Sequence, residues 1–133
     1  MRYWILKSEP DAYSWQQMQQ DGITSWDGVR NYQARNNIRR MNPGDLGFFY
    51  HSNLERAIVG IVQIASLPYP DKSNPNFTAI DVKFHSQIKH PLTLTAIKAD
   101  QKLANLPLIK QSRLSVMEIT EKDWKYIISL TSF

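Results

Sequence analysis

The chain has 133 residues, 42% of them hydrophobic and 21% charged, which is the composition of one globular domain with its own core. It contains no Cys, and this excludes disulfides, thiolate zinc sites, a Cys nucleophile and the Cys-ligated zinc of nucleobase deaminases. Its 16 Lys and Arg exceed its 12 Asp and Glu, so the formal net charge is +4 and an anionic partner is the first hypothesis.

The sequence shows no targeting or membrane signal. The apolar stretch at residues 3–6 is too short for a signal peptide, and no run approaches the length of a membrane span. We therefore expect a soluble, monomeric, cytoplasmic protein without a membrane partner. It would be associated with the nucleoid in a bacterium and nuclear in a eukaryote.

The first elements are indicated by β-formers and caps. Residues 2–7 predict a strand, and Pro10 ends it in a loop because a residue that precedes proline disfavours helix. Ser14 and Gln17 have the spacing of a capping box, so a short helix is predicted after Ser14, with Gly22 as its C-cap.

The segment from Trp26 to Met41 carries the charge. It turns at Gly28 and predicts a helix with an apolar face beside a polar and basic stripe. Four arginines and no acid lie between Gly28 and Met41, whereas the rest of the chain has 12 basic and 12 acidic residues. Arginine suits phosphate because its fork donates two parallel hydrogen bonds. The alternative is a merely solvated face. The apolar face is Ala34, Ile38 and Met41, and the stripe is Asn31, Arg35 and Arg39.

The second half of the chain predicts most of the sheet. After a turn at residues 42–45, residues 46–51 and 57–67 predict an antiparallel pair, the first of them covered on both faces. Residues 77–88 alternate as a strand, residues 94–103 predict a short helix and residues 112–119 a last strand. Thr120 caps a final helix in which Trp124, Ile127 and Ile128 share one face. This order predicts a single α+β domain with a mostly antiparallel, barrel-like sheet.

Four polar strings fall at strand ends or in loops, where binding residues tend to lie. Together they supply aromatic planes with hydroxyl, amide and carboxylate groups, which is the chemistry of a pocket for a flat heteroaromatic ring. The strings are Lys7-Ser8-Glu9-Pro10, Trp26-Asp27-Gly28, Tyr50-His51-Ser52 and Arg113-Leu114-Ser115.

The same residues also allow the hypothesis that the protein is an enzyme. His51, Asp27 and either Ser8 or Ser115 would make a triad, but no Gly-x-Ser-x-Gly elbow is present. The three His lack metal-ligand spacing, and the five Gly form no phosphate-binding loop. We therefore expect a binding module with no metal, no cofactor and no catalytic residues.

Longer strings resemble the EVE domain family. They are residues 3–10, residues 26–36, Tyr50-His51-Ser52, Tyr69-Pro70-Asp71 and Arg113-Leu114-Ser115-Val116, in this order over essentially the whole chain. That family belongs to the PUA-like superfamily and is related to the YTH readers of methylated adenine. The resemblance implies one domain over residues 1–133, built as a curved, PUA-like β-barrel with flanking helices.

The resemblance also implies a function. It indicates a small pocket that receives a flipped, modified base, with methylated or hydroxymethylated cytosine in DNA as the leading ligand class. Trp26 would stack on the base unless it is a core residue, and arginines would meet the phosphates. The base pocket would comprise Ser8, Trp26, Asp27, Asn31, Tyr50, His51, Ser52, Leu114 and Ser115, and the phosphate contacts Lys7, Arg30, Arg35, Arg39 and Arg113.

One loop departs from the family pattern. Many members carry a longer, proline-rich insert after the Tyr69-Pro70-Asp71 string, ending in a tryptophan, whereas here the loop is short and Phe77 is expected in that tryptophan's place. We therefore expect a smaller lid over the pocket.

Two other functions remain open from the sequence. A module that binds modified RNA or tRNA would use the same charge and aromatic residues. A small nucleotide-processing enzyme would use Glu9, Asp27 and His51. Salt separates polymer binding from the enzyme, because counterion release makes binding to a polyanion fall steeply as salt rises.

Overall fold

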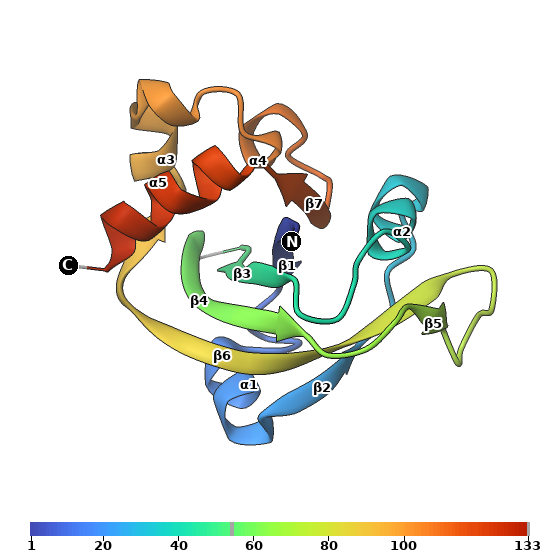
Figure 1. Cartoon of the computed structure of the whole chain (residues 1–133). Helices are drawn as coiled ribbons and strands as arrows, with labels where there is room; N and C mark the ends of the chain where they lie inside the picture. The colour runs from blue at the N-terminus through green and yellow to red at the C-terminus, as the bar shows by residue number, and fades with distance from the viewer. Residues whose placement is uncertain (54, 133) are drawn as a thin grey trace.

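A seven-stranded mixed sheet forms the centre of the protein in this computed structural model, which describes residues 1–53 and 55–132 (Figure 1). The strand order is β2-β6-β4-β3-β1-β7, and β5 pairs with β6 outside this path. The elements are β1 (Tyr3–Ser8), α1 (Trp15–Asp21), β2 (Ile23–Trp26), α2 (Tyr32–Ile38), β3 (Leu46–His51), β4 (Ala57–Ile64), β5 (Tyr69–Pro70), β6 (Thr78–Thr93), α3 (Leu94–Ala99), η1 (Gln101–Leu103), α4 (Pro107–Lys110), β7 (Val116–Ile119) and α5 (Glu121–Thr131).

The predicted α+β class with a curved, mostly antiparallel sheet is confirmed. β1 and β3 run parallel, and the other strand pairs among the described residues are antiparallel. Among the described residues the sheet is not closed, because β2 and β7 stand at the two ends of its path. The curvature is clearest in β6, which sweeps across the whole sheet (Figure 1). Its register with β4 shifts twice, and such irregularities bend a strand.

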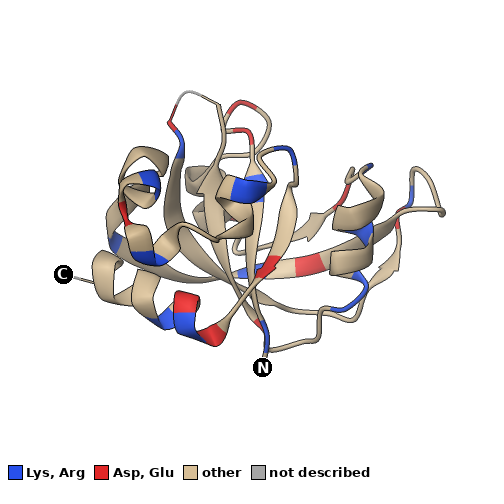
Figure 2. Ribbon diagram, turned by 90° about the horizontal axis from the view of Figure 1, so that it is seen from above, with Lys and Arg blue, Asp and Glu red and all other residues tan. Residues whose placement is uncertain are grey.

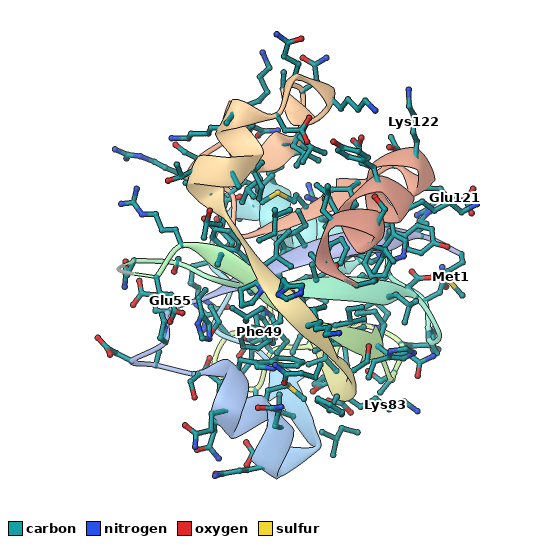
Figure 3. The ribbon with its side chains drawn as sticks, turned by 90° about the vertical axis from the view of Figure 1, so that its left-hand side faces the viewer. Met1, Phe49, Glu55, Lys83, Glu121 and Lys122 are labelled. Atoms are coloured by element: carbon teal, nitrogen blue, oxygen red, sulfur yellow. The ribbon has the colours of Figure 1, made fainter. Side chains whose placement is uncertain are left out.

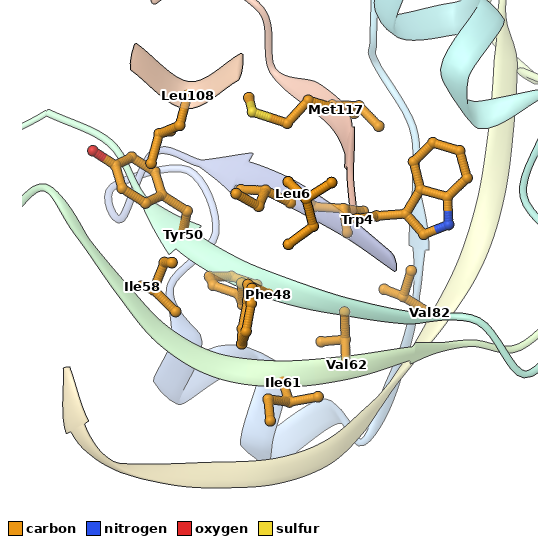
Figure 4. Close-up of a cluster of buried hydrophobic side chains, with 14 of the residues drawn as sticks. Trp4, Leu6, Phe48, Tyr50, Ile58, Ile61, Val62, Val82, Leu108 and Met117 are labelled. Atoms are coloured by element: carbon orange, nitrogen blue, oxygen red, sulfur yellow. The ribbon is translucent and has the colours of Figure 1, made fainter. Parts of the chain in front are cut away.

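Both faces of the central strand β3 are covered. On one face Phe48 stacks on Trp124 of α5 with ring centroids 4.0 Å apart, and on the other Phe49 lies 5.1 Å from Trp15 of α1. Figure 4 shows the dense side-chain cluster to which Phe48 belongs, with Trp4, Leu6 and Val62 beside it. The apolar run of residues 46–51 is therefore a strand buried on both sides, as predicted.

The N-terminal half confirms the caps and adds a strand. The Ser14 side chain accepts the Gln17 amide hydrogen at 3.0 Å, and Gly22 ends α1 with φ +74°. The sequence reading did not anticipate β2, which pairs with β6. The helix predicted to follow Gly28 directly begins only at Tyr32, because Asn31 is its N-cap.

The C-terminal half differs from prediction in its boundaries. β6 continues beyond residue 88 to Thr93, and the helix predicted at residues 94–103 is divided into α3 and η1. β7 begins only at Val116, since the Leu114 amide closes a turn onto the Gln111 carbonyl. Thr120 caps α5, and Trp124 and Ile127 are buried, as predicted. No helix in the described ranges has the length and hydropathy to cross a membrane.

Candidate functional site

A cavity of about 630 Å³ opens where β1 and β2 end. Two of its residues are basic and two are acidic, so its charged groups balance. It is lined by Lys7, Ser8, Glu9, Ala12, Tyr13, Thr24, Ser25, Trp26, Asp27, Gly28, Val29, Arg30 and Ser115. We call it the first pocket.

Trp26 is a wall of the first pocket and also part of the core. The residue is only 8% exposed. Its ring meets Phe49 edge-on at 5.6 Å and Tyr13 edge-on at 6.4 Å. These contacts hold the indole in one orientation, so the aromatic face offered to a ligand is preformed.

The turn after Trp26 is fixed by a carboxylate from the loop after β5. Gly28 has φ +74°, and its amide donates to Asp71 Oδ2 at 2.9 Å. The same oxygen accepts Arg30 Nη1 at 3.1 Å, while Oδ1 accepts the amide and hydroxyl of Ser73. These bonds, chiefly those from Ser73 and Gly28, hold the pKa of the Asp71 carboxyl well below its ordinary value. Asp71 therefore shapes the rim of the first pocket.

The parallel pairing of β1 and β3 brings several predicted site residues together. Ser8 and His51 are register partners, so the loops after the two strands start at the same edge of the sheet. There the Ser52 amide donates to the Ser8 carbonyl at 2.9 Å, and the Lys7 amide donates to the Ser115 carbonyl at 2.8 Å. The strings at residues 7–10, 50–52 and 113–115 do converge.

The side chains of Tyr50, His51 and Ser52 nevertheless do not face one common site. Successive side chains of a strand point to opposite faces, and here Tyr50 lies under Lys7 while His51 points toward α1. His51 Nε2 accepts the Trp15 amide hydrogen at 2.9 Å, and burial lowers the pKa of the imidazole, which nearby Glu55 partly opposes. Tyr50 and Ser52 line a different cavity of about 390 Å³, the second pocket.

Three other predicted residues lie at a separate hollow of about 340 Å³ beside the start of α2, lined by Asn31, Gln33, Lys110, Gln111, Ser112, Arg113 and Leu114. The Asn31 side chain is engaged in capping, since its Oδ1 accepts the Ala34 amide at 2.9 Å. Leu114 is buried in the core. The structure does not bring Asn31, Arg113 or Leu114 to the first pocket.

The segment of residues 26–41, which we call the α2 segment, contains four arginines, and these have partners within the protein. Arg35 and Arg39 donate to the Asn76 carbonyl, and Arg39 also donates to Thr78 Oγ1 at 3.0 Å. Arg40 pairs with Glu118 at 2.7 Å. Basic positions elsewhere are spread over several elements (Figure 2). Of the arginines in this segment, only Arg30 lines the first pocket.

Comparison with known proteins identifies the family. The family model described as EVE domain matches residues 2–130. The chain belongs to the EVE domain family. A protein from Rhodopseudomonas palustris solved by NMR has a TM-score of 0.94 at 40% identity, covering 98% of this chain and 93% of its own. Human THYN1, crystallised with 5-methylcytosine-containing DNA, has a TM-score of 0.92 at 31% identity, covering 98% of this chain and 97% of that chain.

This EVE domain is shorter than some of its relatives. Thymocyte nuclear protein 1 of chicken is 35% identical over 164 aligned positions, which include 96% of this chain, or about 128 residues, and 68% of the relative. The relative therefore carries extra residues inside the aligned region. In this EVE domain the connection from β5 to β6 is closed tightly, since the Asp71 amide donates to the Phe77 carbonyl at 3.0 Å. Phe77 stacks on Tyr32 at 5.4 Å, beside the first pocket's Arg30.

Sequence reasoning missed several residues that line the first pocket of this EVE domain. Tyr13, Thr24, Ser25 and Val29 were not among the predicted site residues, although they form much of its wall. The available signal was the run Ile23-Thr24-Ser25-Trp26, whose β-formers directly precede the Trp-Asp-Gly string. Recognised as a strand, it would have placed Thr24 on the same face as Trp26.

Proposed function

We propose that this EVE domain is a non-enzymatic nucleic-acid reader that accepts a flipped, modified cytosine of DNA in its first pocket. The observation that carries this proposal is the match, over nearly all of both chains, to human THYN1 crystallised with DNA containing 5-methylcytosine. The first pocket supports it by its size, because about 630 Å³ lies within the usual range of small-ligand sites.

The wall of the first pocket suits a flat base. Trp26 supplies a stacking surface that Phe49 and Tyr13 hold in place. Asp27 and Glu9 supply carboxylates, which accept hydrogen bonds from the exocyclic amino group of cytosine. Thymine and uracil lack that group, so these acids favour cytosine. Ser8 and Ser115 add small polar groups to the wall.

The positive charge of the first pocket suits the phosphates of a nucleic-acid strand whose base is bound there. Lys7 and Arg30 both line the first pocket. Lys7 lies near the end of β1, and Arg30 lies in the loop after β2. Of these two cations Arg30 already donates to Asp71 and Ser73, so a phosphate flanking an extruded nucleotide would gain more from Lys7. Partial burial lowers the pKa of the Lys7 ammonium. A nearby phosphate would oppose that shift.

The atoms of a possible catalytic triad are engaged otherwise, which supports a binding role. The Ser8 hydroxyl donates to the Tyr13 carbonyl, and His51 Nε2 accepts from the Trp15 amide. A general base must reach the proton of its nucleophile. His51 is turned toward α1 and does not line the first pocket with Ser8 and Asp27.

The test is a matched set of oligonucleotides measured by fluorescence anisotropy. Duplexes would carry one cytosine, 5-methylcytosine or 5-hydroxymethylcytosine at the same position, and RNA versions would match them. Burying one methyl contributes about 0.8 kcal/mol, or roughly four-fold, and unpaired polar groups increase the ratio. We expect a three- to thirty-fold preference for modified cytosine in DNA, as an order-of-magnitude estimate. Equal affinities throughout would overturn the proposal, and tighter RNA binding would favour the RNA alternative.

Base flipping needs its own measurement. A 2-aminopurine placed beside the modified cytosine fluoresces more strongly when its neighbour leaves the stack. We expect the protein to increase this fluorescence in the modified duplex and to do so less in the unmodified one. Binding without any increase would leave a reader that does not flip its base.

A further inference from the structure

The second pocket gathers positive charge from three distant parts of the chain. Lys7 comes from β1, Arg56 from the residues just before β4, and Lys98 from α3. Among the described residues that line it there is no acid. The lining consists of Lys7, Tyr50, Ser52, Asn53, Arg56, Leu94, Lys98, Leu108, Ile109 and Ser112.

These cations are only partly engaged within the protein. Among the described residues the Arg56 side chain makes one hydrogen bond, from Nε to the Asn53 carbonyl at 3.1 Å, and the Lys7 ammonium donates to the Ser112 carbonyl at 2.8 Å. Within the described part of the chain Lys98 makes no side-chain hydrogen bond or ion pair, and both it and Arg56 are exposed. Three positive charges around one cavity repel one another, and a bound anion would relieve this repulsion.

The floor of the second pocket offers a hydroxyl. The Tyr50 ring is buried against the core, and its hydroxyl points away from the labelled apolar side chains, with Leu108 above the ring (Figure 4). Burial raises the pKa of the Tyr50 phenol, while the charge of Arg56 lowers it. The phenol therefore keeps its proton at neutral pH and can donate a hydrogen bond to an oxyanion.

The two pockets are neighbours, because Lys7 lines both of them. The Lys7 ammonium lies 5.9 Å from the centre of the Tyr50 ring, on the second-pocket side. Lys7 and Arg30 are the two cations that line the first pocket, so they mark two sides on which a strand could pass. On the Lys7 side, the second pocket adds two further cations, Arg56 and Lys98, and no acid among its described lining residues.

We propose that the second pocket binds a backbone phosphate of the strand whose flipped base occupies the first pocket, with Arg56, Lys98 and the Tyr50 hydroxyl as donors. This inference rests on the proposed function. It gives the strand a direction across the surface, from Arg30 over the first pocket to the second pocket. It also separates two tasks: the first pocket selects the base, and the second pocket grips the strand without regard to the base.

The principal test is the double variant Arg56→Ala, Lys98→Ala. Its control is Lys122→Ala, Lys125→Ala on α5, which removes the same charge; Figure 3 shows Lys122 far from Glu55, the neighbour of Arg56. One phosphate contributes about 0.9 to the slope of log affinity against log salt. We expect the first variant to reduce that slope by about 1, to weaken binding of methylated and unmethylated duplexes by the same factor of about five to ten, and to keep their ratio. We expect the control to bind as the parent does.

Three results would overturn the phosphate site. They are an unchanged slope in the Arg56 and Lys98 variant, an equal loss in the control, and a collapse of the methyl preference, which would assign these residues to the base. Failure of the proposed function is a separate result, because it is the absence of a methyl preference in the parent protein.

The source of the phosphate is tested by competition. The probes are the nucleoside 5-methyl-2′-deoxycytidine and its 5′-monophosphate, each added to the protein bound to a labelled methylated duplex. We expect both to compete only at millimolar concentrations, since each lacks the flanking strand. A monophosphate that competes at micromolar concentrations while the nucleoside does not would overturn the strand assignment in favour of a free nucleotide.

Discussion

The arginines of the α2 segment are close in sequence, whereas the cations of the second pocket come from β1, from the residue just before β4 and from α3. In the folded protein the arginines that are close in sequence are the ones already engaged, and the cations that are far apart in sequence are the ones available to a ligand. Arg35, Arg39 and Arg40 donate to carbonyl, hydroxyl and carboxylate groups of the protein. Arg56 and Lys98 face a cavity with no acid among its described lining residues.

This comparison separates charge from availability. All these side chains contribute to the long-range field that attracts a polyanion. A phosphate, however, is held by donors that are not already engaged, because exchanging one partner for another yields little net free energy. Clustering of basic residues in the sequence indicates long-range attraction to a polyanion. Which of these residues can bind a phosphate is known only from the fold.

The largest expected effect comes from removing the base site while leaving both charged regions intact. Trp26→Ala should cost about ten- to a hundred-fold in affinity for the methylated duplex, because stacking contributes about 1–3 kcal/mol per base. Since Trp26 is 8% exposed, the free energy of unfolding should also fall by about 3–5 kcal/mol. The salt slope, measured well below the melting temperature, should stay as in the parent.

Trp26→Phe is the matched control, because it retains an aromatic ring in the same contacts. It should recover most of the stability and part of the methyl preference. If Trp26→Ala lowers stability but leaves the methyl preference unchanged, Trp26 is a core residue only.

Asp71→Asn should make Arg30 of the α2 segment more available to a phosphate, as the cations of the second pocket already are. The change weakens the partner of Arg30 and leaves the Gly28 turn less firmly held, so we expect a loss of about 1–3 kcal/mol in the free energy of unfolding. Because Arg30 becomes more available, the salt slope should steepen by up to about 1. A stable variant with an unchanged slope would contradict the role of Asp71 as a clamp.

The same variant has a pH signature. The folded-state pKa of Asp71 is depressed, so its stabilisation is present above the unfolded-state pKa, near 4, and is lost as the pH falls toward the folded-state value. The parent should therefore lose stability in acid more steeply than Asp71→Asn does. Denaturant unfolding at a series of pH values below 5 measures the difference.

A smaller effect is expected from the double variant Arg35→Ala, Arg39→Ala. If the internal bonds dominate, stability should fall by about 1 kcal/mol, because α2 loses its ties to residues 76–78. The salt slope should then change by less than 1. A slope reduced by about 2 would show instead that both arginines bind phosphate, as the sequence suggested.

The smallest expected effect is a mild pH dependence that involves neither charged region. Burial depresses the folded-state pKa of His51, so the unfolded chain binds a proton first as the pH falls below 6.5, and stability decreases from there down to the folded-state pKa. His51→Gln should remove this slope just below pH 6.5, measured by denaturant unfolding at a series of pH values. A parent protein whose stability is flat there would show that folding does not lower the pKa of His51.

Most of the fold could be predicted because its signals are local. Ser14 and Thr120 cap their helices as expected, and the apolar run at residues 46–51 is a strand covered on both faces. What could not be predicted is long-range pairing. Nothing within residues 3–8 specifies that β1 pairs parallel with β3, and the short β2 depends on β6 for its hydrogen bonds.

The site shows the same division. Ser8, Trp26, Asp27 and Ser115 were predicted together from polar strings and do line one pocket. Tyr50 and His51 were predicted together as neighbours in sequence, and the two-residue period of a strand sends them to opposite faces. Asn31 was expected in the pocket, but a residue just before a helix is also a cap, and capping is the role it has here.

The position of β1 has a consequence for how the chain acquires its structure. β1 is made of residues 3–8, yet it lies between β3 and β7, so its hydrogen bonds are complete only when residues 116–119 are present. During synthesis, the strand carrying Trp4, Ile5 and Leu6 leaves the ribosome long before its second partner. Such non-local pairing slows folding and leaves an apolar strand edge exposed in the nascent chain. We therefore expect the β7-facing edge of β1 to stay unpaired until residues 116–119 have been synthesised.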